Sequence, residues 1–151
     1  MKIQLTRRGD YAVRAVICLA AEGSDKVVKS HSVASEMDIP VGFMPQVFGD
    51  LVRAGIVRAH HGQRGGYELQ RDATEISLLD VVEAVEGPIG RERCVMHGDD
   101  CPNDTPCAVH HVWMRLREAL SEALASATIA ELAAQHQAVA PGRVGGDPTL
   151  T

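Results

Sequence analysis

Residues 41–70 read VGFMPQVFGDLVRAGIVRAHHGQRGGYELQ, and this stretch decides the fold. Its first half predicts a helix that begins near residue 41 and ends at Gly55, because four apolar residues recur at helical spacing: Met44, Val47, Phe48 and Leu51. Pro45 fits this helix, since a residue in the first turn needs no N–H partner. A shorter helix pattern over residues 32–37 and a tight turn precede it. The two helices together form a helix-turn-helix pattern.

The second half of the stretch predicts a β-hairpin. Residues 56–60 and 67–70 are short alternating segments, and the glycine-rich segment 61–66 lies between them. Gln63 and Arg64 are expected to project from the tip, where an arginine can enter a narrow, electronegative minor groove. An ordinary surface hairpin is the alternative. Directly after a helix-turn-helix, we favour a DNA-binding wing.

Further helices are expected on both sides of this unit. Thr6 is a suitable N-cap for a first helix that ends near Gly23. Cys18 lies within that helix, and we interpret it as a small core residue and not as a metal ligand. After the hairpin, Ser77 and Asp80 have the spacing of a capping box, which opens a helix that stops at Gly87-Pro88.

The longest periodic segment, residues 108–127, carries an apolar stripe with charged residues opposite. We interpret it as a dimerisation helix, with a helix that packs only within its own core as the alternative. The expected fold class is mostly α with a small β-hairpin wing: a winged helix-turn-helix plus a long dimerisation helix. The expected domains are a DNA-binding domain (1–88), a cysteine loop that binds a cluster (89–107), the dimerisation helix with a short following helix (108–133), and a disordered tail (134–151).

Composition and charge limit the classes of function. The chain is 45% apolar but only 3% aromatic, so its core should be aliphatic. Its net charge of −5 is uneven: residues 1–71 hold ten Lys/Arg against seven Asp/Glu, whereas residues 72–151 hold five against thirteen. This asymmetry favours a basic working face in the first half. No signal peptide, membrane span, nucleophile–base pair or phosphate loop is recognisable, so we expect a cytoplasmic protein that is not an enzyme.

Three of the four cysteines, Cys94, Cys101 and Cys107, lie in one segment rich in Gly, Pro, Asp and Asn, which predicts a loop. The spacings C-x6-C and C-x5-C do not suit a zinc site built from closely spaced cysteine pairs. Three cysteines are an odd number, and nothing marks the chain as secreted, so structural disulfides within this segment do not suit it either. An iron–sulfur cluster with one non-cysteine ligand fits this segment better than loop cysteines that bind no metal.

Several stretches together resemble the Rrf2 family of winged-helix regulators, and the likeness covers roughly residues 1–133. They are LTRRGDYA (5–12), RGGYEL (64–69), ISLLDVVEAVEG (76–87) and the three loop cysteines. The resemblance implies a homodimer that binds a double-stranded DNA operator as a repressor or activator. It also implies control by an iron–sulfur cluster that senses nitric oxide, oxygen, redox state or cellular iron–sulfur status.

The fourth cluster ligand separates two branches of that family. NsrR-like members resemble this chain in an aspartate at the position of Asp10, which reaches the cluster of the other subunit. IscR-like members use a histidine at the position of His110. Both residues are present, and the six residues between Cys94 and Cys101 depart from both patterns. We favour Asp10, and a 4Fe–4S cluster over a 2Fe–2S cluster. The alternatives are a macrodipole interaction for Asp10 and an exposed position for His110.

The resemblance also suggests where DNA is read. Pro45 stands where IscR carries a discriminating glutamate, so Gln46 and Asp50 are the nearest candidates for base contacts. We expect Arg8 and Arg58 to contact phosphates. The function that we expect is an NsrR-like repressor that senses nitric oxide or redox and oxygen stress. The alternatives are an IscR-like regulator of cluster assembly or iron homeostasis and, less favoured, an iron–sulfur carrier that does not bind DNA.

Overall fold

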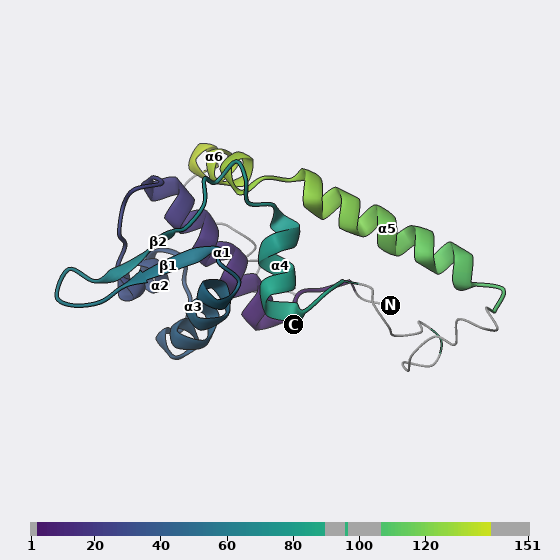
Figure 1. The fold of residues 1–151 in the computed structure, drawn as a ribbon, viewed down its shortest axis with the longest axis horizontal. Helices are drawn as coiled ribbons and strands as arrows, with labels where there is room; N and C mark the ends of the chain where they lie inside the picture. Colours follow the sequence, from purple (N-terminus) through teal and green to yellow (C-terminus); the bar gives the residue numbers. More distant parts are fainter. Residues whose placement is uncertain (1–2, 90–95, 97–106, 140–151) are drawn as a thin grey trace.

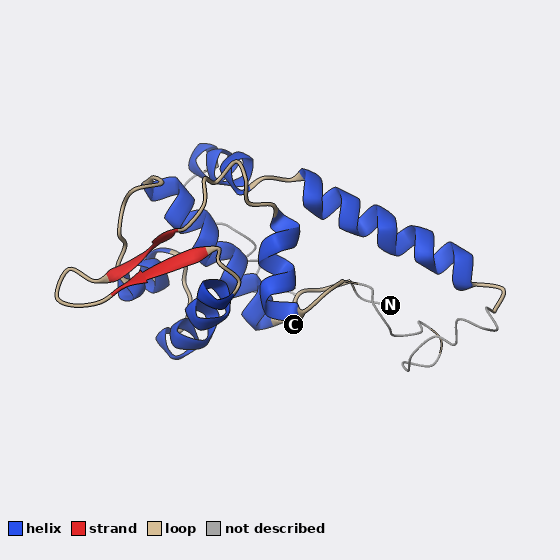
Figure 2. Ribbon diagram, in the orientation of Figure 1, coloured by secondary structure: helices blue, strands red, loops and turns tan. Residues whose placement is uncertain are grey.

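The computed structural model describes residues 3–89, Met96 and residues 107–139. Within these residues the chain is mostly helical with one two-stranded antiparallel hairpin, which confirms the winged-helix fold class (Figures 1 and 2). The elements are α1 (Arg7–Glu22), α2 (Ser30–Glu36), a 3-10 turn η1 (Val41–Phe43), α3 (Met44–Arg53), β1 (Val57–His60), β2 (Gly66–Leu69), α4 (Leu78–Glu86), α5 (His110–Ser126) and α6 (Ile129–Ala138).

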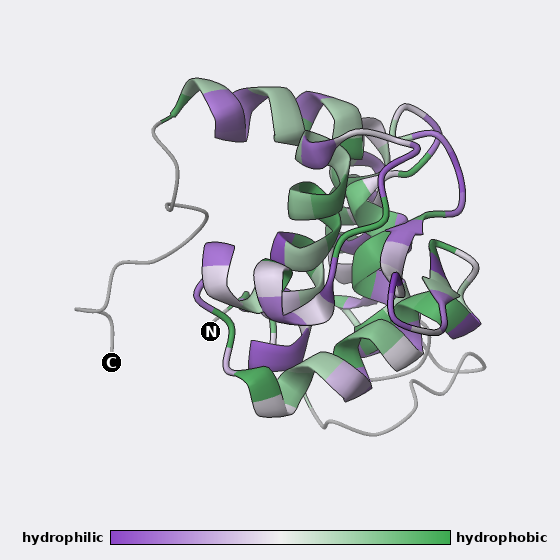
Figure 3. Ribbon diagram, turned by 90° about the vertical axis from the view of Figure 1, so that its left-hand side faces the viewer, coloured by the Kyte–Doolittle hydropathy of each residue, from purple (hydrophilic) through white to green (hydrophobic). Residues whose placement is uncertain are grey.

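Helix α1 is the centre of the fold, since it contacts α2, α3, α4, α6 and β2. The core is mainly aliphatic, as the composition predicts, and Phe48 is its largest fully buried side chain. Hydrophobic and hydrophilic residues alternate around the helices, as expected for helices that bury one face (Figure 3). α2 and α3 form the helix-turn-helix on one side of this core.

The predicted caps of α1 and α4 are confirmed, whereas α2 spans Ser30–Glu36 and not residues 32–37, and α3 begins at Met44, after the 3-10 turn over residues 41–43. Thr6 Oγ1 accepts a hydrogen bond from the Gly9 N–H at 3.1 Å and caps α1. The capping box of α4 is complete, because Asp80 N–H donates to Ser77 Oγ at 3.0 Å and Ser77 N–H donates to Asp80 Oδ2 at 2.9 Å. α4 stops at Gly87, whose φ of +84° is a conformation that glycine adopts without steric cost.

The wing is attached to the rest of the fold through β2. β1 and β2 pair antiparallel from Val57↔Leu69 to His60↔Gly66, and the other edge of β2 forms a bridge between Tyr67 and Val28. Gly66 is required there, because a Cβ on it would lie 2.4 Å from the Val28 carbonyl oxygen. The Tyr67 ring stacks on Phe48 of α3 with centroids 3.8 Å apart, so α3 and the wing form one unit.

Helix α5 extends away from the body of the molecule (Figure 1), and none of its residues is buried. It begins at His110, two residues later than predicted. α6 runs to Ala138, which corrects the predicted start of the tail at residue 134. The helix continues because Ile129, Ala133 and His136 are buried at its start, middle and last turn. The rest of the predicted tail, residues 140–151, lies outside the described residues. No helix among the described residues is long and apolar enough to cross a membrane.

Candidate nucleic-acid interface and cysteine segment

The exposed side of α3 is the first part of the candidate interface. Buried side chains occupy one face of this helix: Met44, Val47, Phe48, Asp50 and Leu51. The opposite face presents Gln46 to solvent, as the sequence predicts, together with Arg53, whose side chain is 75% exposed. Arg53 is a candidate phosphate contact that the sequence analysis missed. A basic residue in the last turn of the second helix of the helix-turn-helix is visible in the sequence and could have indicated it.

Asp50 does not face solvent, whereas the prediction that it reads bases requires an exposed side chain. Its side chain is only 8% exposed and lies between two arginines. One carboxylate oxygen pairs with the Arg53 guanidinium, and the other lies 3.4 Å from Arg8 Nε. A carboxylate buried between two cations is held there, because exposing it to the phosphates of DNA would cost both attractions.

Arg8 has a structural role in addition to the predicted phosphate contact. Besides its ion pair with Asp50, its Nη2 donates a hydrogen bond of 2.7 Å to the Val85 carbonyl. Arg8 thereby connects α1 to α3 and to the last turn of α4. The side chain is 38% exposed, so a phosphate contact is sterically open to it and stays a prediction.

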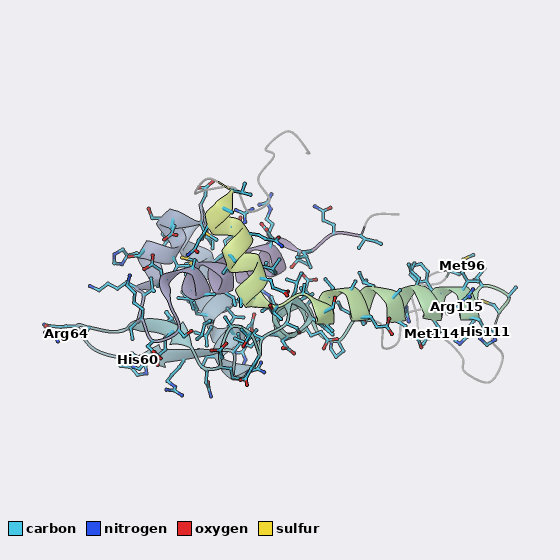
Figure 4. All side chains as sticks on the ribbon, turned by 90° about the horizontal axis from the view of Figure 1, so that it is seen from above. His60, Arg64, Met96, His111, Met114 and Arg115 are labelled. Carbon is cyan, nitrogen blue, oxygen red and sulfur yellow. The ribbon has the colours of Figure 1, made fainter. Side chains whose placement is uncertain are left out.

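The wing forms the second part of the candidate interface. Gln63 and Arg64 are exposed in the hairpin connection, and Figure 4 shows Arg64 at the extreme end of the molecule. Arg58 lies opposite Glu68 in the strand register, with 3.6 Å between Nη1 and Oε1. His60 Nε2 lies 2.8 Å from the same carboxylate oxygen. The Glu68 carboxylate thus lies beside the Arg58 guanidinium and the His60 imidazole. These two groups reduce the negative potential of the wing near its tip.

The cysteine segment is described at its end only. Cys94 and Cys101 lie outside the described residues, as does His97. Cys107 is a free, exposed cysteine directly before α5, and its carbonyl accepts the His110 N–H at 3.0 Å. Among the described residues, no group of three or more His, Cys, Asp or Glu side chains is placed to hold a metal ion.

The other two candidate ligands lie on separate helices. Asp10 is in the first turn of α1 and forms an ion pair with Arg14, 2.7 Å between Oδ2 and Nη2. It borders an open hollow of about 330 Å³. His110 begins α5, which Figure 4 shows extending to the end of the molecule opposite Arg64. Asp10 and His110 therefore correspond to two alternative positions for the fourth cluster ligand, on two different helices.

Cys18 is fully buried in α1, which confirms its prediction as a core residue. Burial raises the pKa of its thiol to about 12, and the nearby Glu36 carboxylate adds to the shift. At neutral pH this thiol is protonated, whereas a metal ligand or nucleophile must be a thiolate. Its environment therefore separates Cys18 from the exposed Cys107.

A helix-turn-helix with an adjoining hairpin wing defines the class of winged-helix DNA-binding proteins. The model of the Rrf2 family, described as an iron-dependent transcriptional regulator, matches residues 5–135. This chain belongs to the Rrf2 family. It is therefore a transcriptional regulator and not an enzyme.

Individual relatives agree with this assignment. The protein Rv1287 of Mycobacterium tuberculosis strain H37Rv is 35% identical over 131 residues, which are 87% of this chain and 81% of that protein. IscR of Vibrio vulnificus strain YJ016, an HTH-type transcriptional regulator, is 30% identical over 137 residues, 91% of this chain and 81% of IscR. CymR, the global cysteine regulator of B. subtilis, superposes with a TM-score of 0.75 at 27% identity, over 89% of this chain and 98% of CymR.

Proposed function

We propose that this chain is a cytoplasmic homodimeric repressor that senses nitric oxide or an oxidant through an iron–sulfur cluster. Three cysteines would hold the cluster: Cys94, Cys101 and Cys107. The observation that carries the proposal is the contrast between Cys18, buried and protonated, and Cys107, exposed beside a helix start in a three-cysteine segment. When bound, the cluster supplies the centre that reacts with nitric oxide or oxidants.

Helix α5 supports the dimer. It exposes large apolar side chains that a single chain leaves uncovered: Val112, Met114 and Leu116. An apolar hollow of about 320 Å³ lies beside it, lined by Ile3, Ile89, Trp113, Leu116, Arg117 and Leu120. A second copy would bury both, and two copies would present two recognition helices to one pseudo-palindromic operator.

Asp10 is the fourth ligand that we propose, from the other subunit. Its carboxylate is partly exposed beside an open hollow, so a partner's cysteine segment can reach it. It would give up a two-point ion pair with Arg14, whose Nε and Nη2 lie 3.1 Å and 2.7 Å from the two carboxylate oxygens, so the bond to iron has to outweigh that pair. Because Asp10 lies in the same helix as Arg8, a ligand bond to it would act on the helix that contacts α3 and α4.

The IscR-like alternative rests on a different observation. The backbone bond between His110 N–H and the Cys107 carbonyl closes a turn directly before α5. The turn holds the two residues close together in space, so both could bind one iron. In that scheme, the cluster would be held within one subunit, and regulation of cluster assembly would be the more suitable role.

Binding to generic duplex DNA tests the proposed function against an iron–sulfur carrier. We expect the purified protein to shift generic DNA in a gel at about 50 mM salt and to lose roughly 10³-fold in affinity by about 200 mM, as for a protein with about six phosphate contacts. Absorption spectra of protein purified without oxygen would report the cluster in the same sample. A carrier would show the cluster but no DNA binding at either salt concentration.

The wing makes a separate contribution that Arg64→Ala should reveal. We expect DNA affinity to fall about tenfold with an unchanged melting temperature, because Arg64 is exposed at the tip and supports no core contact. Arg115→Ala is the matched control, since this exposed arginine lies on α5, far from the wing (Figure 4). Equal affinities of Arg64→Ala and the parent protein across salt concentrations would exclude a DNA contact by the tip.

A further inference from the structure

The exposed face of the recognition helix carries a strip of residues without polar side-chain groups. Val41, Pro45, Gly49 and Val52 follow one another at i, i+4, i+8 and i+11, so they lie along one side of η1 and α3. Val41 is 66% exposed and Val52 is 37% exposed. In residues 6–89, all of which the structure describes, these are the two exposed large apolar side chains. Apolar groups gathered on an exposed helix face indicate a binding surface.

The polar groups beside this strip limit what it can recognise. Gln46 and Arg53 are exposed on the same side of α3. Asp50, the one acidic residue of α3, is withdrawn into its ion pairs with Arg8 and Arg53. The helix therefore presents no carboxylate that could accept a hydrogen bond from a cytosine amino group.

Gly49, in the middle of the strip, is not explained by the fold. It has ordinary helical geometry, and a Cβ added to it would meet no atom closer than Arg53 Nη1 at 3.9 Å. Glycine within a helix lowers its stability relative to alanine. A glycine that neither packing nor backbone geometry requires suits a position where another molecule approaches the backbone closely.

We infer that this strip reads the C5-methyl groups of thymines in the major groove, with Gly49 at the point of closest approach. The thymine methyl is the apolar feature of the major groove, and a glutamine side chain pairs well with adenine. The strip and Gln46 therefore recognise the two halves of A·T pairs. The inference rests on the proposed function, in which α3 enters the major groove of DNA.

Uracil substitution tests this inference, because uracil pairs like thymine but lacks the C5-methyl group. The full-length protein would first select duplexes from a random-sequence pool, and each thymine of a selected duplex would then be replaced by uracil. We expect affinity to fall about threefold to fivefold for each contacted methyl group removed. In Val52→Ala or Val41→Ala, this penalty should shrink at one position. Val139→Ala, an exposed valine after α6, should keep the full penalty.

Gly49→Ala gives an independent readout that a structural role would not produce. We expect a higher melting temperature together with roughly tenfold weaker binding of the selected duplex, because the added methyl group stabilises the helix and obstructs the approach. Equal binding of thymine and uracil duplexes would overturn the inference. So would a uracil penalty unchanged by both valine substitutions, since the methyl groups would then act through DNA stiffness. If no duplex is enriched from the pool, the proposed function itself is contradicted. That outcome is distinct from a failure of the thymine inference, which requires a selected duplex.

Discussion

Cys101→Ala should remove nearly all iron and sulfide from protein purified without oxygen, and the same result is expected for Cys94→Ala and Cys107→Ala. Thiolates supply most of the binding energy of an iron–sulfur cluster, and no other group of the loop replaces them. Iron and sulfide analysis with absorption spectroscopy measures the loss. Binding of the selected operator should change with it, because the proposed cluster controls the dimer's two DNA-reading units.

Cys18→Ala is the matched control for this experiment. The substitution removes a buried sulfur from the core of α1 and should lower the melting temperature somewhat, while leaving the iron and sulfide content intact. Unchanged iron and sulfide in Cys101→Ala would refute the ligand assignment. Cluster loss in Cys18→Ala without unfolding would contradict the structural role given to that thiol.

The second large effect should separate Asp10 from His110. If Asp10 binds the partner's cluster, Asp10→Ala should change the cluster's absorption and circular dichroism spectra and hasten its loss in air about tenfold or more. It should also shift DNA affinity, whereas His110→Ala should leave both nearly unchanged. Oxygen ligation is suited to a sensor, because a carboxylate holds iron less firmly than a thiolate and leaves it open to attack.

Arg14→Gln controls for the ion pair that Asp10→Ala also destroys. It removes the charge beside Asp10 and keeps the carboxylate, so cluster spectra should stay as in the parent protein. Equal effects of Arg14→Gln and Asp10→Ala would assign the change to the lost ion pair. A large effect of His110→Ala alone would establish the IscR-like scheme and move the proposed role toward control of cluster assembly. If neither ligand substitution has an effect, another group completes the site.

The ion pairs of the buried Asp50 carboxylate make Arg8 part of the contact between α1, α3 and α4. A carboxylate whose two oxygens face Arg8 and Arg53 holds α3 against α1, and Arg8 in turn binds the last turn of α4. α4 leads directly into the cysteine segment. Through Asp50 and Arg8, α3 is therefore connected to α1, which carries Asp10, and to α4, which precedes the cysteine segment.

Local patterns in the sequence determined most of the fold. Apolar spacing, capping residues and glycine-rich turns act within a few residues of one another, so the helices, their caps and the wing could be predicted from the sequence. The mostly aliphatic core and the interior position of Cys18 followed in the same way. The family could be identified because its motifs are contiguous stretches of sequence.

Only the tertiary structure decided which polar residues of α3 are available to a ligand. Asp50 and Gln46 are equivalent in the helical pattern, yet Asp50 is buried because Arg8, distant in sequence, approaches it from α1. The exposed Arg53, and the absence of any packing reason for Gly49, likewise depend on contacts across elements. Ion pairs between distant residues and the space around a side chain depend on how the helices pack together. The periodicity of residues within one helix cannot predict them.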